Sequence, residues 1–193
     1  GYCDYYDHLP GGNAFGRSIQ AELFNLNELG AWKSRFRRSP GAMPLATSEA
    51  QRLLLMKRTS AGAKMAAQLG ARVAVQKVTR RDVVGSGGSL QGRMLQIALR
   101  MGVEIWTETM LLDLDIQNGK VVGAHLERAG EPVHVAASKG VLIAAGGFAR
   151  NLKMREQYQP HPASDRWTKA NPGDTGEVIQ IMERAGAGLG MMD

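Results

Sequence analysis

The fold is decided by the stretch Val141-Leu142-Ile143-Ala144-Ala145, which is followed directly by Gly146-Gly147. Five apolar residues without a polar interruption predict a strand buried on both faces, as at the centre of a parallel sheet. Two glycines at its end allow a tight turn and a close approach of the backbone to a ligand. Ligands of open α/β sheets bind outside the carboxyl ends of the strands, so this turn is a candidate binding site. A core strand that merely ends in a turn is the alternative.

The segment before this stretch predicts an antiparallel meander of three strands. Residues 111–117 alternate between apolar and polar side chains, which is typical of a half-buried strand. Asn118-Gly119 is a strong hairpin signal, because both turn positions require positive φ. The return strand is expected at 121–128, and a second turn at 129–131 leads to a third strand at 133–137.

Two helices are predicted before the meander. The first begins at Ser48, with Gln51 as its capping-box partner, and ends at Gly70. The glycine-rich residues 85–89 form a loop, and the second helix begins with Ser89 as its N-cap. A glycine-rich loop that opens a helix can bind an anion, although a flexible linker is an equally simple interpretation.

The remaining elements complete an α/β order. A strand is expected at 103–109, directly before the meander. A short helix ends at Tyr158, and a last helix begins at Asp174, with Glu177 as its capping-box partner. Residues 1–45 predict short strands, irregular loop and, from Ala31 onward, a surface connection.

The charge of the chain favours an anionic small ligand over nucleic acid. The net charge is +6, but the basic residues gather only at 33–38 and at Arg80-Arg81. Aromatic residues make up 6% of the chain, too few for the stacking platforms of single-strand binders. We therefore expect no nucleic-acid partner. A non-catalytic interaction module that uses the basic segment 33–38 stays as the alternative from a different class.

The cysteine and histidine content predicts neither a disulfide nor a metal site. Cys3 is the single cysteine, and the four histidines are scattered without ligand spacing: His8, His125, His134 and His161. No apolar run reaches the roughly 20 residues of a membrane span, and no targeting segment is visible. A cytoplasmic location is expected. The chain begins at Gly1 rather than Met, and we expect it to be a piece of a longer protein.

Short motifs in a fixed order run along the chain. They are Asp4-Tyr5-Tyr6, Pro10-Gly11-Gly12, Gly16-Arg17-Ser18-Ile19, the segment 140–148, Asn151, Met154-Arg155 and Thr175-Gly176-Glu177. Together they resemble the 3-ketosteroid dehydrogenase branch of the FAD-dependent fumarate reductase/succinate dehydrogenase flavoprotein superfamily. The resemblance covers the whole chain but only the middle of a family member. Glu177 departs from it, since the family usually has Asp there.

The resemblance implies an α/β fold: part of an FAD/NAD(P)-binding Rossmann-like domain, with a parallel sheet plus the antiparallel meander, and part of a substrate or cap lobe. Residues 1–80 would belong to the substrate/cap lobe and its connection. Residues 81–193 would belong to the FAD-binding domain, with 151–193 leading back toward the substrate lobe.

The resemblance also implies roles for individual residues. Tyr5 would lie in the substrate pocket and assist proton abstraction next to a ketone. The residues expected along FAD are Met110 at the adenine, Ala144, Ala145, Gly146 and Gly147 at the turn, and Thr175 and Gly176 before the last helix.

The implied activity is the desaturation of a small hydrophobic ketone of the 3-ketosteroid type, with a hydride passed to the flavin. A fumarate reductase-like enzyme that binds dicarboxylates, with Arg17 as one candidate ligand, is the alternative. The sequence contains no GxGxxG fingerprint for the FAD pyrophosphate. We therefore expect the 193 residues alone to bind little FAD and to be inactive.

Overall fold

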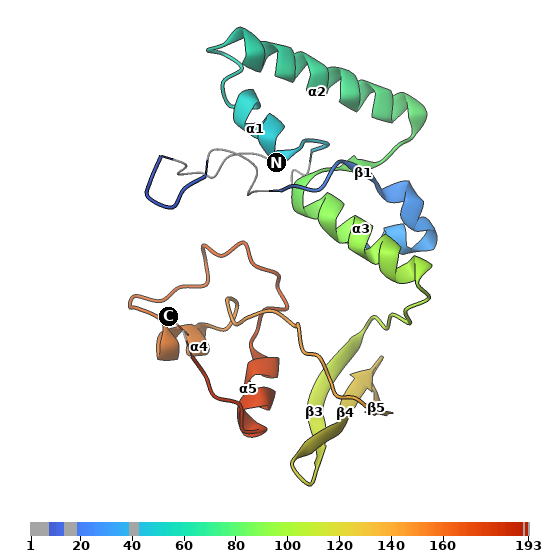
Figure 1. The fold of residues 1–193 in the computed structure, drawn as a ribbon, viewed down its shortest axis with the longest axis vertical. Coiled ribbons are helices and arrows are strands. Elements are labelled where there is room, and N and C mark those ends of the chain that lie inside the picture. The colour runs from blue at the N-terminus through green and yellow to red at the C-terminus, as the bar shows by residue number, and fades with distance from the viewer. Residues whose placement is uncertain (1–7, 14–18, 39–42, 191, 193) are drawn as a thin grey trace. The chain divides into compact units, whose positions relative to one another are not determined.

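The computed structural model describes residues 8–13, 19–38, 43–190 and 192. The chain divides after Glu104 into two compact units (Figure 1). The predicted boundary between a substrate lobe and an FAD-binding domain after residue 80 stays a prediction, because the packing of the chain does not test which ligand each part binds. Within the described residues, no helix is both long and apolar enough to cross a bilayer.

The first unit is built on a small apolar core beneath two short strands. Strand β1 (Phe24–Asn25) pairs antiparallel with β2 (Val83–Val84), and the 3-10 helix η1 (Leu26–Arg35) follows β1 directly. The buried core side chains are Phe24, Leu26, Leu29 and Val84, with Trp32, Phe36 and Leu95 packed against them. The predicted surface connection from residue 31 is therefore wrong up to Arg35, because Trp32 faces this core.

The first predicted helix is two helices in the structure. Helix α1 (Thr47–Leu53) and helix α2 (Ser60–Thr79) are separated by a turn at 54–58. The new start has a local cause, because the Thr59 hydroxyl accepts the backbone N–H of Gly62 at 3.0 Å. Gly70 does not end α2, which continues to a left-handed Arg80. The capping carboxylate of α1 is Glu49 rather than Gln51, since Glu49 accepts the backbone N–H of Ala46 at 2.9 Å.

Helix α3 (Ser86–Arg100) begins earlier than predicted. Its N-cap is Gly85, so the glycine-rich segment forms the first turn of the helix rather than a loop. Ser89 lies inside that turn, fully buried, and its hydroxyl donates to the carbonyl oxygen of Ser86 at 2.9 Å. The helix ends at Arg100 with Met101 as its C-cap, and Gly102 follows with a positive φ of 69°.

The predicted meander is confirmed in the second unit. Strands β3 (Thr109–Gln117), β4 (Lys120–Arg128) and β5 (Glu131–Ala136) form an antiparallel sheet in the order β3-β4-β5 (Figure 1). Asn118 and Gly119 form the first turn with φ of 51° and 75°, as the hairpin signal requires. Ala129 and Gly130 form the second turn with the same signs.

The expected buried strand at 141–145 is wrong for the part of the chain that the structure describes. The segment is extended but pairs with no described strand, and the expected strand at 103–109 is irregular up to residue 108. Leu142 is 93% exposed. Both sheets are antiparallel, so the expected parallel sheet is absent from the described residues. An apolar run becomes a central strand only where neighbouring strands satisfy its backbone, and here the meander strands pair only with one another.

Two short helices complete the second unit. Helix α4 (Leu152–Tyr158) ends where the sequence predicts, and its N-cap Asn151 accepts the backbone N–H of Met154 at 3.1 Å. Helix α5 (Glu177–Arg184) lies against β3. Its N-cap is Gly176 in a left-handed conformation, so the prediction of Asp174 as the cap is wrong.

Candidate functional site

The structure brings together two of the segments predicted to line a cofactor. We call them the glycine turn (residues 144–147) and the α5 entry loop (residues 174–176). The backbone N–H of Arg150, just after the turn, donates to the carbonyl oxygen of Asp174 at 2.8 Å. The side-chain amide of Asn151 donates to the carbonyl oxygen of Thr175, also at 2.8 Å. Segments far apart in the sequence therefore form one surface.

Glycine is required at two positions of this surface. Gly146 and Gly176 have φ of 84° and 79°, a region that L side chains rarely adopt. A Cβ on Gly176 would lie 2.4 Å from the sulfur of Met154 and 2.8 Å from Cβ of Phe148. A Cβ on Gly146 would lie 2.3 Å from Oδ1 of Asp174. At Gly176 the Cβ of Phe148 leaves no room for a side chain, and at Gly146 the positive φ and the carboxylate of Asp174 both disfavour one, so the two glycines let the segments meet.

The glycine turn presents its backbone to solvent. Ala144, Ala145, Gly146 and Gly147 are all exposed, and a Cβ on Gly147 would meet nothing within 4 Å. Thr175 is half-buried beside them, and its hydroxyl donates to the carboxylate of Glu177. Polar backbone groups of the turn are thus accessible to a ligand.

An apolar cavity of about 560 Å³ adjoins this turn. Its walls come from the meander, from the extended segment 140–145 and from Val178 of α5. The meander residues that line it are Leu111, Ala124, Leu126 and Val135, with Ala137 just after β5. A cavity with apolar walls and a rim of free backbone suits a flat ring system that carries polar edges.

Met110 does not line the apolar cavity that Ala144 and Ala145 line. It lies near the start of β3, opposite Glu127, and is 52% exposed. Its neighbour Leu111 lines the apolar cavity, whereas Met110 does not. The adenine contact at Met110 therefore stays a prediction.

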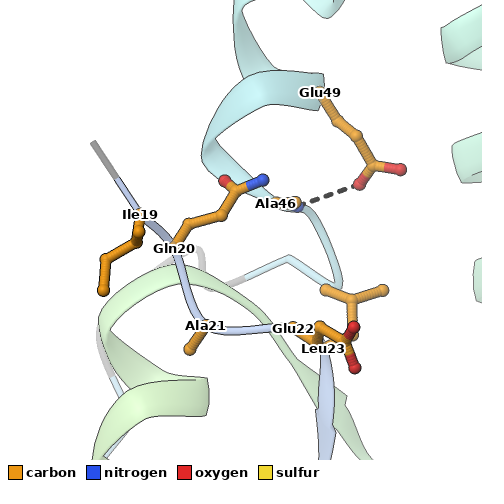
Figure 2. A pocket seen from close by; sticks show the side chains of 7 residues that line it. All are labelled: Ile19, Gln20, Ala21, Glu22, Leu23, Ala46 and Glu49. Atoms are coloured by element: carbon orange, nitrogen blue, oxygen red, sulfur yellow. Dashed lines mark hydrogen bonds between the residues drawn. The ribbon is translucent and has the colours of Figure 1, made fainter. Parts of the chain in front are cut away.

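The predicted catalytic Tyr5, and Arg17 of the alternative, lie outside the described residues. The first unit also contains an open depression of about 490 Å³, lined by residues 19–23, Ala46 and Glu49 (Figure 2). Gln20 attaches this strand-like segment to α1, because its side-chain amide donates to the Ser48 hydroxyl at 2.9 Å.

The carboxylate of Glu49 at this depression is already engaged. Arg72 of α2 donates to its two oxygens at 2.8 and 2.9 Å and to the carbonyl oxygen of Pro44 at 2.6 Å. The hydrogen bond from Arg72 lowers the pKa of Glu49, with partial burial opposing it, and the same bond raises the pKa of Arg72. Glu49 therefore holds α1 to α2 rather than serving as an acid or base.

Three potential metal ligands, which the sequence did not predict as a group, gather on the meander: Asp115, His125 and His134. The two histidines face each other across β4 and β5. The pairing of His125 with His134 could have been predicted from the turn at Ala129-Gly130. A two-residue turn pairs the positions that lie equally far before and after it.

The glycine-turn surface and the apolar cavity are compatible with a flavin site, and comparison with known protein families identifies the class. The profile of the family described as "FAD binding domain" matches residues 5–193, so the chain belongs to that family. Its cofactor is FAD, as predicted.

Individual relatives show which members of the family the chain is similar to. The chain is 36% identical over 202 residues to a 3-oxosteroid 1-dehydrogenase of Mycobacterium tuberculosis, covering 100% of this chain and 36% of that protein. It superimposes with a TM-score of 0.84 and 29% identity on a 3-ketosteroid delta1-dehydrogenase of Sterolibacterium denitrificans, in complex with 1,4-androstadiene-3,17-dione, over 100% of this chain and 37% of that one. A partial match, 28% identical over 56% of this chain and 12% of the other, is an NADH:fumarate oxidoreductase of Klebsiella pneumoniae. The chain thus spans about a third of the length of its steroid dehydrogenase relatives.

The described residues fit part of an FAD molecule. The exposed backbone of the glycine turn and the open space at Gly147 allow close approach, and the apolar cavity offers walls for a ring. The glycine-rich pyrophosphate fingerprint is not in the printed sequence. These residues therefore provide contacts along the cofactor but not the phosphate-holding turn.

Proposed function

We propose that the protein carrying this chain is an FAD-dependent 3-ketosteroid dehydrogenase that introduces a carbon–carbon double bond next to the ketone. The supporting observation is the full-length similarity of the chain to steroid dehydrogenases, in sequence at 36% identity and in fold at a TM-score of 0.84. The fumarate oxidoreductase similarity covers 56% of the chain, which favours the steroid over the dicarboxylate.

The reaction removes a proton and a hydride from neighbouring carbons of the substrate. When bound, FAD accepts the hydride and its two electrons. Tyr5 assists removal of the proton that the ketone makes acidic. A tyrosine ionises near pH 10 in water, so this role requires a positive charge or hydrogen-bond donors that favour its phenolate.

Other residues of this chain position the cofactor. The glycine turn and the α5 entry loop, held together by Asn151, present Ala144, Ala145, Gly146, Gly147, Thr175 and Gly176 toward it. In this proposal Met110 contacts the adenine. Residues 1–80 contribute to the substrate lobe and residues 81–193 to the FAD-binding domain.

The basic segment does not support the interaction-module alternative. Lys33 and Arg38 both pair with Asp82, at 2.9 Å for Lys33, and the guanidinium of Arg35 lies 5.3 Å from the centre of the Trp32 ring. These three side chains make their contacts within the first unit. We therefore propose that the protein has no nucleic-acid partner. A gel-shift titration at low salt, with no shifted band, is the expected result.

We also propose a cytoplasmic location, which the single cysteine in the sequence supports. Fractionation of cells that express the whole protein is expected to recover it with cytoplasmic markers, and recovery with an exported fraction would contradict this.

Turnover by the whole protein tests the activity. Purified, FAD-saturated protein is mixed with a 3-ketosteroid and an artificial electron acceptor, and reduction of the acceptor is followed. Steroid-dependent reduction with a new double bond beside the ketone is expected. Activity with succinate or fumarate but with none of a panel of 3-ketosteroids would replace the proposal with the dicarboxylate alternative.

A further inference from the structure

The three potential ligands on the meander are close enough to act as a group. One ligand atom from each of Asp115, His125 and His134 lies within 4.8 Å of the others. Nε2 of His134 is 3.0 Å from Oδ2 of Asp115, and the two imidazole rings lie with their centres 4.9 Å apart. Carboxylate and imidazole are both ligands for divalent transition metals.

The strand register places these side chains on one face of the sheet. His125 is directly opposite His134, and Asp115 is opposite Gly123, two residues before His125 on β4. Ala124 and Val135, which line the apolar cavity, alternate with the histidines and so face the other side. The group is therefore separate from the surface assigned to FAD.

Gly123 gives His134 the space to reach Asp115. A Cβ at Gly123 would lie 3.0 Å from Nε2 of His134 and 2.6 Å from the carbonyl oxygen of Val135. Because Gly123 has no side chain, the His134 ring can extend from β5 across β4 to Asp115 on β3. The irregular register just after Asp115 belongs to the same region of the sheet.

The distances are close to those of a zinc site. Zinc binds imidazole nitrogen and carboxylate oxygen at about 2.0–2.2 Å, which puts neighbouring tetrahedral ligand atoms about 3.4 Å apart. Nε2 of His134 and Oδ2 of Asp115, 3.0 Å apart, lie near this spacing. His125 is exposed at the surface of the sheet, and its ligand atom lies within 4.8 Å of the other two, so a small side-chain adjustment would bring the three atoms around one ion.

Partial burial and nearby groups also suit an ion. The Asp115 side chain is 20% exposed and that of His134 46%, so water can occupy the remaining coordination positions. The side-chain amide of Gln117 lies 3.4 Å from Oδ1 of Asp115 and helps to orient the carboxylate. The guanidinium of Arg184 lies 3.9 Å from Oδ1 of Asp113 on the same strand.

We propose that Asp115, His125 and His134 form a binding site for a divalent transition metal ion, with Zn²⁺ as the expected occupant. The proposal does not depend on the flavin chemistry. The alternative is that His134 and Asp115 form only an ion pair, in which case this face of the meander would bind no metal ion.

Isothermal titration of the untagged protein with Zn²⁺ tests the site. One ion per chain is expected, and each of Asp115→Asn, His125→Gln and His134→Gln is expected to weaken binding at least about 10-fold, because loss of an outer-shell partner alone costs that much. Asp165→Asn and His161→Gln are matched controls outside the meander and are expected to bind as the parent does. Circular dichroism checks that every variant keeps its secondary structure.

Histidine NMR of the unmutated protein tests the same site independently of how variants fold. Added Zn²⁺ is expected to shift the imidazole signals of His125 and His134 together and to leave those of His8 and His161 in place. Absence of binding by the parent protein, equal binding by all variants, or a shift at His8 or His161 instead would each overturn the proposal.

Discussion

The side-chain amide of Asn151, four residues after the glycine turn, donates a 2.8 Å hydrogen bond to the carbonyl oxygen of Thr175 in the α5 entry loop. The carbonyl oxygen of the same side chain caps α4 through the backbone N–H of Met154. One residue therefore ties the start of α4 to the α5 entry loop, which we assign to the cofactor.

We expect Asn151→Ala to destabilise the second unit by about 1–2 kcal/mol, because it removes a helix cap and leaves a half-buried carbonyl without its donor. FAD affinity of the whole protein is expected to fall as well. Chemical unfolding and quenching of flavin fluorescence measure the two effects. Gln157→Ala, an exposed position on α4, is the control and is expected to change neither. An unchanged FAD affinity in Asn151→Ala would contradict the positioning role.

The ion pair between Glu49 and Arg72 predicts a pH dependence of stability. The pKa of Glu49 is lower in the folded chain than its usual 4.5, so the pair contributes fully above that pH and is lost as pH falls through the lowered value. Asp82 adds to the same trend: partial burial raises its pKa, but the hydrogen bonds from Arg38 and Lys33 outweigh burial and the net shift is downward.

Glu49→Gln is expected to cost about 1–2 kcal/mol at neutral pH and progressively less as pH falls through the lowered pKa of Glu49, where the parent carboxylate takes up a proton. Urea unfolding at about pH 7 and about pH 3 measures the difference. Glu22→Gln, also at the rim of the depression in Figure 2, serves as the control. An equal cost of Glu49→Gln at both pH values would show that the ion pair does not carry the effect.

Helix α3 approaches β1 at a glycine. A Cβ on Gly92 would lie 2.6 Å from Cδ1 of the Phe24 ring, which is almost fully buried. Gly92→Ala is therefore expected to destabilise the first unit by about 1–3 kcal/mol. Gly87→Ala in the same helix meets nothing within 4 Å and is expected to be neutral or slightly stabilising. Thermal unfolding of the two variants compares them directly, and similar melting temperatures would refute the close packing.

Tyr5→Phe tests the proposed proton abstraction. We expect kcat of the whole enzyme to fall by about 10²–10⁴-fold, because a positioned acid–base group contributes that much, while bound FAD stays the same. Tyr6→Phe is the matched control and is expected to retain activity. A Tyr5→Phe enzyme with parental kcat would remove Tyr5 from the mechanism.

Local signals in the sequence were sufficient for the meander and insufficient for the apolar run. Asn118-Gly119 fixes a two-residue turn by its own conformational preference, so the hairpin could be predicted from adjacent residues. The run at 141–145 predicts burial, but burial requires neighbouring strands, and within the described residues those are missing.

The candidate site likewise has parts that the sequence predicts and parts that it does not. The glycine turn and the α5 entry loop were predicted from motifs and lie side by side. The starts of α2 and α1 depend on local capping contacts of Thr59 and Glu49, which compete with the pair Ser48 and Gln51 that the sequence pattern favoured. The pairing of His125 with His134 follows from turn register, whereas the approach of Asp115 depends on an irregularity in β3 that no short motif indicates.

The most direct test of the central claim is the flavin absorbance of the whole protein, mixed anaerobically with substrate and no other electron acceptor. A 3-ketosteroid with a saturated bond beside the ketone is predicted to bleach the oxidised flavin band, and succinate is predicted to leave it unchanged. Bleaching by succinate but not by the steroid, or a purified protein without a flavin band even after addition of FAD, would contradict the account.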